Sequence, residues 1–260
     1  MRKLIRTAVA AAIAVAAGIG VAEAQALKVG LAAEPYPPFS SPDASGKWVG
    51  WEVEIIDAVC AEAKLECEVT PVAWDGIIPA LTTKKIDLIM SSMSITEDRK
   101  KTIDFTDKYY NTPTAIIGAK TETFDATPEG LKGKILGVQV STVHPDYAKK
   151  HFGDQAAEIK IYQTQDEANA DLAAGRIDAV EADSIALETF LGTDQGKECC
   201  DMKGIVADDV EVLGPGIGAG LRKEDTELKG KLNAAIKAIR DNGKYEEITK
   251  KYFNFDIYGS

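Results

Sequence analysis

The sequence predicts an α/β protein built from two lobes of similar construction. Between residues 27 and 253, short apolar runs typical of buried strands alternate with longer segments of helical periodicity. Such alternation predicts a mainly parallel sheet flanked by helices. The segments LTTKKIDLIMSS (81–92) and LAAGRIDAVEAD (172–183) also share one order of features: helix end, basic turn, Ile-Asp, buried strand and polar strand tip. This echo indicates two similar lobes, although short helix-turn-strand units also recur by chance.

The individual elements follow from periodicity and from helix and strand boundary signals. In the first half we expect strands at 28–32, 66–71 and 86–90, with helices at 52–64 and 74–83. In the second half we expect strands at 115–119, 134–138, 158–162 and 178–182, with helices at 145–152 and 166–174. The chain is then predicted to end in helices at 226–240 and 244–253, separated by the Asn-Gly stop signal at 242–243.

Residues 1–26 have the pattern of a secretory signal peptide. Three basic residues precede an uncharged Ala/Val/Ile/Gly run at 7–22, and small residues surround Ala24 and Ala26. Cleavage after either alanine fits the small-x-small rule, and the domain boundaries below count the mature chain from Leu27. The apolar run is short for a membrane span, so we expect an exported protein and not a membrane-anchored one.

The charge of the predicted mature chain argues against nucleic acid as a partner. Without the leader the chain has 27 basic and 40 acidic side chains, a net charge of −13. Such a surface repels nucleic acid and anionic lipid. It favours cationic solutes mildly, although many proteins carry acidic surfaces for solubility alone.

The four cysteines are expected to form disulfides if the protein is exported to an oxidising compartment. Cys60 and Cys67 bracket the end of a predicted helix and the start of a strand, so we predict that they pair and contribute roughly 2 to 3 kcal/mol. The adjacent Cys199 and Cys200 allow a vicinal bridge, two free thiols or an intermolecular bond. The chain has no CxxC and only two histidines, so we expect no metal site.

The polar stretch SSMSITEDRK (91–100) follows the buried strand predicted at 86–90. The spacing of Ser94 and Glu97 is that of a capping box, which predicts a helix that begins at Ser94 and directs its first N–H groups toward Ser91 and Ser92. Such a helix start attracts an anion, and the guanidinium of Arg99 suits a carboxylate. We therefore predict a carboxylate site. The alternative is a well-capped surface helix with a solvated arginine.

The second strand tip has the opposite chemical character. Asp183 ends the stretch VEAD and offers a carboxylate, so a zwitterion would satisfy both tips. Asp183 also suits the N-cap of a helix that begins at Ser184. Ser141 and Thr142 follow another predicted strand and offer further hydroxyl and N–H groups for the anion, unless they only cap a helix.

Two aromatic residues are candidates for the walls of a cleft. Tyr36 in EPYPPF and Trp74 in AWDGIIPAL stand at loop positions from which their rings can face an aliphatic stem or a cation. Core packing is the alternative for Trp74. The simplest interpretation of His144 and His151, which share one predicted helix, is that both are solvated; a position of His144 near the cleft is the alternative.

Three stretches together carry a family resemblance: YPPFSSPDASGKWVGWEVEI, AWDGIIPAL with KKIDLIMSSMSITEDRKKTIDFT, and GAGLRKEDTEL with NGKYEEITKKYF. The chain resembles the periplasmic polar-amino-acid-binding proteins of ABC importers. The resemblance implies a two-lobed periplasmic-binding-protein fold of type II joined by two crossing strands, with one lobe at 27–112 and 212–260 and the other inserted at 113–211. It also implies a monomer in the periplasm that needs no cofactor, closes on an amino acid and presents it to a membrane permease.

The resemblance implies roles for the polar residues at the two strand tips. The ligand carboxylate is assigned to Ser92, Ser94 and Arg99, with Thr142 assisting from the second lobe. The α-ammonium group is assigned to Asp183. Both assignments agree with the chemistry inferred from the residues themselves.

The ligand side chain is assigned to the aromatic pair Tyr36 and Trp74, and a distal cation to Glu34 and Glu52. A basic or polar amino acid such as arginine, lysine, ornithine or histidine is the expected ligand. The alternatives are a sensor domain and an enzyme on the same fold similar to cyclohexadienyl dehydratase, which needs a buried general acid. We expect no catalysis.

Overall fold

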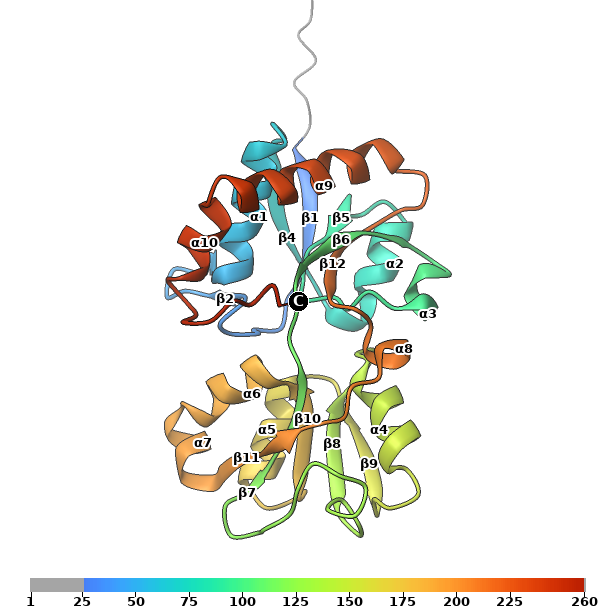
Figure 1. Ribbon diagram of the computed structural model, residues 1–260, viewed down its shortest axis with the longest axis vertical. Coiled ribbons are helices and arrows are strands. Elements are labelled where there is room, and N and C mark those ends of the chain that lie inside the picture. Colours follow the sequence, from blue (N-terminus) through green and yellow to red (C-terminus); the bar gives the residue numbers. More distant parts are fainter. Residues whose placement is uncertain (1–25, 260) are drawn as a thin grey trace, which may run out of the picture.

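The protein is described by a computed structural model that covers residues 26–259 as two lobes stacked along the long axis (Figure 1). The predicted leader lies outside the described residues except for Ala26. Within the described range, every helix is too short or too polar to cross a membrane.

A five-stranded sheet forms the centre of the first lobe, in the order β4-β1-β5-β12-β6. Its strands are β1 (Leu27–Ala32), β4 (Cys67–Val72), β5 (Leu88–Ile89), β6 (Asp104–Tyr110) and β12 (Ile217–Leu221). The pairs β4-β1 and β1-β5 are parallel, and β12 is antiparallel to both of its neighbours. The other elements are the short strands β2 (Ser41–Pro42) and β3 (Trp48–Val49), α1 (Trp51–Glu62), the 3-10 helix η1 (Trp74–Gly76), α2 (Ile77–Thr82), α3 (Glu97–Lys100), α9 (Thr226–Asp241) and α10 (Lys244–Thr249).

The second lobe has a sheet of the same design, in the order β11-β7-β10-β8-β9. Its strands are β7 (Thr114–Ala119), β8 (Ile135–Gln139), β9 (Glu158–Tyr162), β10 (Ala179–Asp183) and β11 (Cys200–Ile205). The pairs β10-β8 and β8-β9 are parallel, and β7 is antiparallel to β10 and β11. Four helices flank this sheet: α4 (His144–Phe152), α5 (Gln165–Ala173), α6 (Ser184–Leu191) and α7 (Asp194–Cys199).

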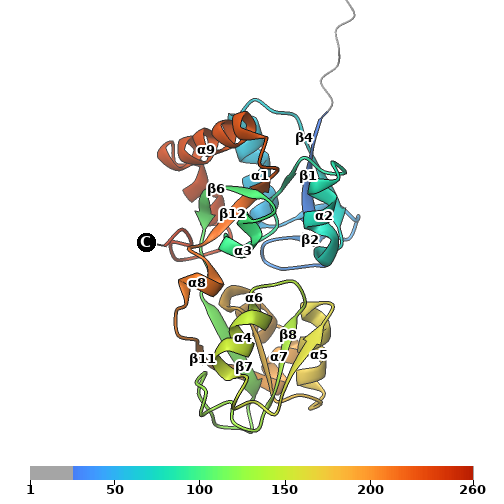
Figure 2. The same ribbon diagram turned by 90° about the vertical axis from the view of Figure 1, so that its right-hand side faces the viewer.

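The chain passes between the lobes twice. It leaves the first lobe between β6 and β7 at 111–113 and returns between β11 and β12 at 206–216, a segment that contains the short helix α8 (Val210–Leu213). Figure 2 shows α8 beside the crossing segments, between the lobes. The predicted boundaries at 112 and 211 fall inside these two connections. The C-terminal segment pairs with the first connection, because Asn111 donates its N–H to the carbonyl of Ile257 at 2.9 Å.

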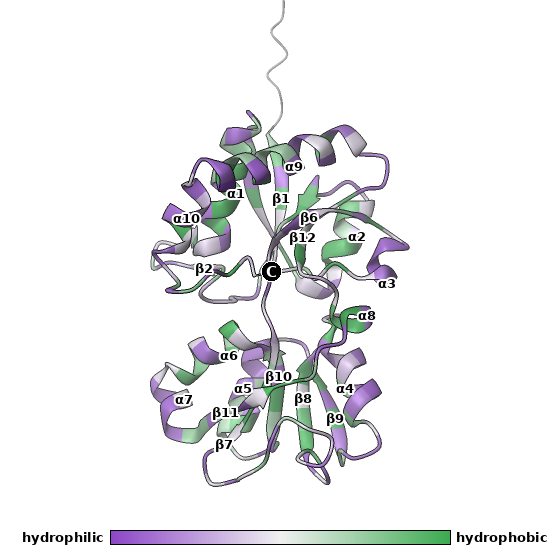
Figure 3. Cartoon of the chain, in the orientation of Figure 1, coloured by the Kyte–Doolittle hydropathy of each residue, from purple (hydrophilic) through white to green (hydrophobic). Residues whose placement is uncertain are grey.

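The apolar core follows the sheets. Figure 3 shows hydrophobic residues along the central strands of both lobes and both hydrophilic and hydrophobic residues along the helices. In the first lobe one cluster centres on Trp51 and its aromatic neighbours and another on Leu81 and Ile86; the second lobe also has two clusters. Both faces of each sheet are buried, which explains why the central strands appear in the sequence as continuous apolar runs.

The internal echo in the sequence marks equivalent places in the two sheets. β5 and β10 each occupy the middle of a sheet and each follow a helix. The repeated aspartate has a structural role: Asp87 accepts the N–H of Lys28 at 2.9 Å, and Asp178 accepts that of Ile135 at 2.7 Å. Each carboxylate therefore ties the turn before a central strand to the start of the neighbouring parallel strand.

Most predicted elements are present with boundaries shifted by a few residues, but four differ more. The helix expected at 74–83 divides into η1 and α2, the last helix ends at Thr249, and the helix expected from Ser94 begins at Glu97. The side chain of Thr96 is its cap and accepts the N–H of Arg99 at 3.2 Å. Ser94 lies two residues before the cap, and its backbone forms a β-bridge with Ile217. The strand expected at 86–90 is reduced to the two residues of β5.

Both cysteine pairs are joined. The predicted disulfide between Cys60 and Cys67 is confirmed, with the two Cα atoms 6.2 Å apart. Cys199 and Cys200 form a vicinal disulfide at the junction of α7 and β11. Of the alternatives that the sequence left open for this pair, the structure has the intramolecular bridge.

Candidate functional site

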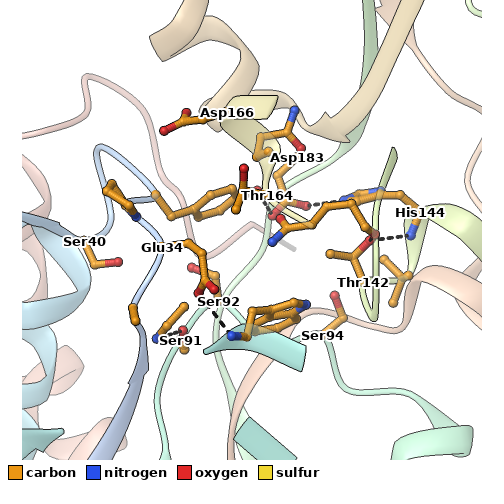
Figure 4. A pocket seen from close by; sticks show the side chains of 18 of the residues that line it. Glu34, Ser40, Ser91, Ser92, Ser94, Thr142, His144, Thr164, Asp166 and Asp183 are labelled. Carbon is orange, nitrogen blue, oxygen red and sulfur yellow. Dashed lines mark hydrogen bonds and ion pairs between the residues drawn. The ribbon is translucent and has the colours of Figure 1, made fainter. Parts of the chain in front are cut away.

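A pocket of about 260 Å³ lies between the lobes and is lined from both of them (Figure 4). Its volume is slightly below the usual range for drug-sized ligands, so it suits a small solute. The polar or aromatic lining residues from the first lobe are Glu34, Tyr36, Ser40, Trp74, Ser91, Ser92, Ser94 and Arg99. Those from the second lobe are Gln139, Thr142, His144, Thr164, Gln165, Asp166 and Asp183.

Arg99 is the cation of this pocket. Its guanidinium donates to the carbonyl of Ser94 at 2.9 Å and, across the cleft, to the carbonyl of Ser141 at 3.0 Å. It also lies over the ring of Trp74, 5.7 Å from the ring centroid. Burial lowers the pKa of Arg99 to about 10, a value at which the side chain remains charged at neutral pH. The site therefore offers a fixed, partly desolvated positive charge.

Three serines after β5 line the wall beside Arg99. Ser91 is buried and accepts the N–H of Ala32 at 2.8 Å, which fastens the tip of β5 to the neighbouring strand. Ser92 has a φ of 52°, in the left-handed region that few non-glycine residues adopt. This backbone conformation turns the segment sharply, so that the loop from Ser91 to Ser94 borders the pocket.

Glu52 does not line the pocket, although the resemblance assigns it to a distal cation of the ligand. Its carboxylate accepts the N–H of Ser92 at 2.7 Å, the hydroxyl of Ser92 at 3.1 Å and the hydroxyl of Tyr109. Burial raises its pKa, and these three hydrogen bonds oppose that shift. Because Glu52 stands in the first turn of α1 with no exposed surface, it holds the strained turn at Ser92 from behind.

Asp183 is the buried acid on the opposite lobe. It is the N-cap residue of α6, but its side chain makes no capping hydrogen bond. Instead it accepts the hydroxyl of Tyr36 at 2.8 Å across the cleft. Burial raises the pKa of Asp183 to about 6, against the opposing effects of the Tyr36 hydrogen bond and the charge of Arg99. Asp183 therefore has both of the positions considered from the sequence: its backbone begins helix α6, and its carboxyl group faces the pocket.

Of the two interpretations of His144, the position near the cleft is confirmed and the solvated one is wrong. It is only 4% exposed and lines the pocket, with Nε2 3.7 Å from Asp183 Oδ1. α4 begins at this residue, directly after the loop at the tip of β8, and its first turn therefore faces the cleft. His151, two turns later, has a side chain 30% exposed and pairs with Asp209 at 2.7 Å. Burial, then the charge of Arg99, lowers the pKa of His144 to about 3.

Glu34 and Trp74 are linked at one end of the site. The half-buried carboxylate of Glu34 lines the pocket and accepts the backbone N–H of Trp74 at 3.1 Å. The ring of Trp74 belongs to the apolar cluster around α2 and also lines the pocket. Core packing and pocket lining, which the sequence presented as alternatives, thus apply to the same side chain.

The second lobe contributes more residues than the sequence indicated. Thr142 lines the pocket and donates its hydroxyl to the carbonyl of Gln139 at 2.8 Å, whereas Ser141 is absent from the lining and contributes its carbonyl to Arg99. Thr164 to Asp166, which follow β9, were not predicted. Ligands of α/β sheets bind at the carboxyl ends of strands, so the position of these residues after a predicted strand was a usable signal.

Among the residues that the structure describes, three hydrogen bonds join the lobes across or beside the pocket. Two are those of Tyr36 with Asp183 and of Arg99 with the carbonyl of Ser141, and a third joins Gln163 to Asp75 at 3.2 Å. The lobes are therefore closed on the pocket. Within residues 26–259, no group of three or more His, Cys, Asp or Glu residues is arranged to hold a metal ion.

Two α/β lobes that are joined by two connections and closed on a small pocket are typical of the class of solute-binding proteins. Residues 27–255 match the family of bacterial extracellular solute-binding proteins, family 3, and the chain belongs to this family. It is 45% identical to an L-arginine-binding protein of Pseudomonas aeruginosa, over 90% of each chain. It is 41% identical to a histidine-binding periplasmic protein of Salmonella typhimurium, over 89% of this chain and 90% of that protein.

The structure is also similar to solved structures of amino-acid-binding proteins. It matches an ancestral arginine-binding protein bound to arginine with a TM-score of 0.79 and 32% sequence identity, over 88% of this chain and 98% of the other. The resemblance inferred from sequence and the two-lobed fold are both confirmed.

Proposed function

We propose that the protein is a periplasmic receptor that binds a basic or polar α-amino acid and presents it to the membrane permease of an ABC importer. One observation carries the proposal: Arg99 and Asp183 bring opposite charges from opposite lobes into one pocket. A zwitterionic amino acid complements both charges at once. A ligand with only one of the two charges would leave the other pocket group without a partner, which costs free energy in a buried site.

The carboxylate of the ligand is assigned to Arg99, with the loop from Ser92 to Ser94 and the hydroxyl of Thr142 around it. The guanidinium offers planar donors that match a carboxylate. Its present partners are two backbone carbonyls, which fix its orientation and leave the charge without a carboxylate. The arginine is therefore preorganised, so that little side-chain entropy is lost when the ligand binds.

The α-ammonium group is assigned to Asp183. Since Arg99 belongs to the first lobe and Asp183 to the second, the two charges of one ligand connect the lobes and favour the closed arrangement over an open one. In this arrangement Tyr36 already donates to Asp183. The hinge lies in the two connections at 111–113 and 206–216, consistent with lobes at 27–112 plus 212–260 and 113–211.

The side chain of the ligand is assigned to the end of the pocket between Tyr36 and Trp74. Aromatic faces suit an aliphatic stem or a cation, and Glu34 and Asp166 are the acidic lining residues available to a distal positive charge. The relatives named above as arginine- and histidine-binding proteins support a basic ligand. Arginine, lysine, ornithine and histidine form the proposed ligand class, bound by a monomer without chemical conversion.

A thermal-shift screen of the mature protein, unfolded and refolded to remove bound solute, tests this function. A ligand at about 100 times its Kd adds roughly 2.7 kcal/mol to the free energy of unfolding. We expect shifts with basic amino acids and none with agmatine or other amines that lack a carboxylate. Equal shifts with those amines contradict the role of Arg99, and consumption of the bound amino acid contradicts a receptor without enzymatic activity.

Glu34→Gln tests which residue recognises the ligand side chain. Affinity for arginine and lysine should fall far more than affinity for glutamine, because only the basic ligands lose a charge partner. Glu227→Gln is a matched control, since Glu227 is exposed on α9, away from the pocket. Equal losses for basic and neutral ligands in Glu34→Gln would remove this residue from side-chain recognition.

A further inference from the structure

A second buried acid stands behind the pocket and has no hydrogen-bond partner. Glu181 lies two residues before Asp183 on β10, so that both side chains project from the same face of the sheet. Its exposed fraction is 0%, and neither carboxyl oxygen makes a hydrogen bond. Tyr147 does not serve as a donor, because its hydroxyl proton goes to the carbonyl of Ala207 at 2.6 Å. Such a group is expensive to bury and calls for an explanation.

The ring of His144 bridges the two acids of β10. Nδ1 lies 3.5 Å from Glu181 Oε1, and Nε2 lies 3.7 Å from Asp183 Oδ1 (Figure 4 draws the contact with Asp183). Nδ1 is itself buried without a hydrogen-bond partner. Both separations exceed a hydrogen bond by about half an ångström, which small side-chain rotations can close. The unpaired atoms of His144 and Glu181 therefore face each other, and each can satisfy the other.

The charges around this row of three groups determine where the protons lie. An imidazolium at His144 would sit in a dry site beside the positive charge of Arg99, which lowers its pKa. An ionised Glu181 would have no donor at all, and burial raises its pKa well above the ordinary value. Asp183, in contrast, accepts a hydrogen bond from Tyr36 and faces Arg99. The negative charge of the row is therefore most stable on Asp183.

We propose that Glu181 and His144 are positioning residues that hold Asp183 as an ionised, correctly oriented partner for the ligand ammonium group. Glu181, as the neutral acid, donates its O–H to Nδ1 of His144. This selects the tautomer of His144 that carries its proton on Nε2 and donates it to Asp183 Oδ1. With Tyr36 on Oδ2, each oxygen of the Asp183 carboxylate then has one neutral donor. The row carries one negative charge, which balances the positive charge of Arg99.

This arrangement deepens the proposed function and rests on it for the role of Asp183. Glu181 is absent from the pocket lining, so no ligand atom reaches it. The arrangement explains why this acid nevertheless stands beside the imidazole of His144. It also makes the site selective for a zwitterion. The ionised carboxylate of Asp183 repels an anionic ligand group. A neutral ligand group in the same place leaves this carboxylate without a positively charged partner.

The tautomer can be measured without any ligand by nitrogen NMR of histidine-labelled protein. The chain has only two histidines, so His151→Gln assigns both rings. We expect His144 to carry a proton on Nε2 and none on Nδ1, and to show no titration between pH 8 and pH 5; His151, which lies outside the pocket and pairs with Asp209, gives the second signal for comparison. A proton on Nδ1, or an imidazolium in this range, would overturn the proposal. Failure of the wild-type protein to bind amino acids would instead contradict the proposed function and leave this signal intact.

Two variants connect the tautomer to binding. Glu181→Gln keeps a donor toward Nδ1 through its amide, so we expect the same tautomer and an affinity for the amino acid close to that of the wild type. Glu181→Leu removes the donor, and the affinity should fall roughly tenfold while the free energy of unfolding is maintained. An unchanged affinity in Glu181→Leu, or an equal loss in Glu181→Gln, would overturn the positioning role. Chemical denaturation of both variants distinguishes this loss from a folding defect.

Discussion

Glu52 and Glu181 are both completely buried beside the pocket, one in each lobe, but their surroundings differ. Glu52 receives three hydrogen bonds, from the N–H and hydroxyl of Ser92 and from the hydroxyl of Tyr109. Glu181 receives none, and its carboxyl group faces the unpaired Nδ1 of His144. Equal burial therefore has opposite consequences: the first acid is an acceptor that shapes the chain, and the second is suited to be a donor.

Glu52 and Glu181 represent two ways in which a buried acid can support a binding site without lining it. Glu52 acts on backbone geometry, because it holds Ser92 in a left-handed conformation at the edge of the pocket. Glu181, in our proposal, acts on the charge and orientation of Asp183 through an imidazole. The first role should appear mainly in stability and the second mainly in ligand affinity.

The largest effect is expected at Arg99, the positive charge that the first lobe contributes opposite Asp183 of the second lobe. Arg99→Ala should reduce the affinity for the amino acid by about 3 to 5 kcal/mol, because the ligand carboxylate loses its charged partner in a desolvated site. Titration calorimetry measures the loss. Arg99→Lys keeps the charge without the planar donors and should recover only part of it. Retained affinity in Arg99→Ala would remove the carboxylate site from the proposal.

The next effect tests the contrast between the two buried glutamates directly. Glu52→Leu should lower the free energy of unfolding by about 3 kcal/mol, since it leaves the N–H of Ser92 and the hydroxyl of Tyr109 buried without an acceptor. Glu181→Leu should change it by about 1 kcal/mol or less, because a dry acid is replaced by an apolar group. Urea denaturation of the pair measures both. Equal destabilisation by the two substitutions would contradict the distinction drawn here.

A smaller effect is expected from pH. Burial raises the pKa of Asp183 to about 6, with Tyr36, Arg99, Glu52 and His144 around it. A raised pKa means that the carboxyl group is ionised above this value and becomes protonated as the pH falls through it. Affinity for the amino acid should therefore be constant above pH 7 and fall about tenfold for each unit below pH 6.

Calorimetry at pH 7.5, 6 and 5 measures this dependence, and Asp183→Asn is the matched control because an amide cannot titrate. We expect weak binding in this variant with a nearly flat pH profile. A wild-type affinity that stays constant to pH 5 would show that Asp183 does not supply the titrating charge.

The smallest effect is expected at Tyr36, whose hydroxyl is one of the contacts between the lobes. Tyr36→Phe retains the aromatic wall and removes the hydrogen bond to Asp183. It should weaken binding by about 1 kcal/mol and shift the unliganded protein toward open conformations. Calorimetry and small-angle X-ray scattering of the ligand-free protein test the two consequences. An unchanged scattering profile would mean that this contact does not contribute to closure.

The strand tips could be predicted because their signals are local. Arg99 and Asp183 each lie close after a buried apolar strand, and the carboxyl ends of strands are where α/β sheets bind ligands. The structure brings both residues to one pocket. The repeated Ile-Asp was also recognised, although its role in tying neighbouring strands became clear only from the contacts of Asp87 and Asp178.

The start of the helix near Ser94 could not be predicted from its capping box. Ser94 pairs with Ile217, which is more than a hundred residues away in the sequence, and the cap is Thr96. β6, β12, α7 and β11 were likewise not assigned from local pattern. Long-range pairing decides such elements, because strand formation depends on the neighbouring strand more than on intrinsic preference.

By itself the sequence determined the α/β alternation, the two similar lobes, the disulfide between Cys60 and Cys67 and the chemical character of each strand tip. These features depend on periodicity, spacing and side-chain chemistry along short segments. The tertiary structure alone decided that Glu52 is a buried acceptor outside the pocket and that His144 lies inside it against Glu181. The physical reason is that burial and hydrogen-bond partners depend on how helices are set against the sheets and how the lobes close, and both bring together residues that are distant in the chain.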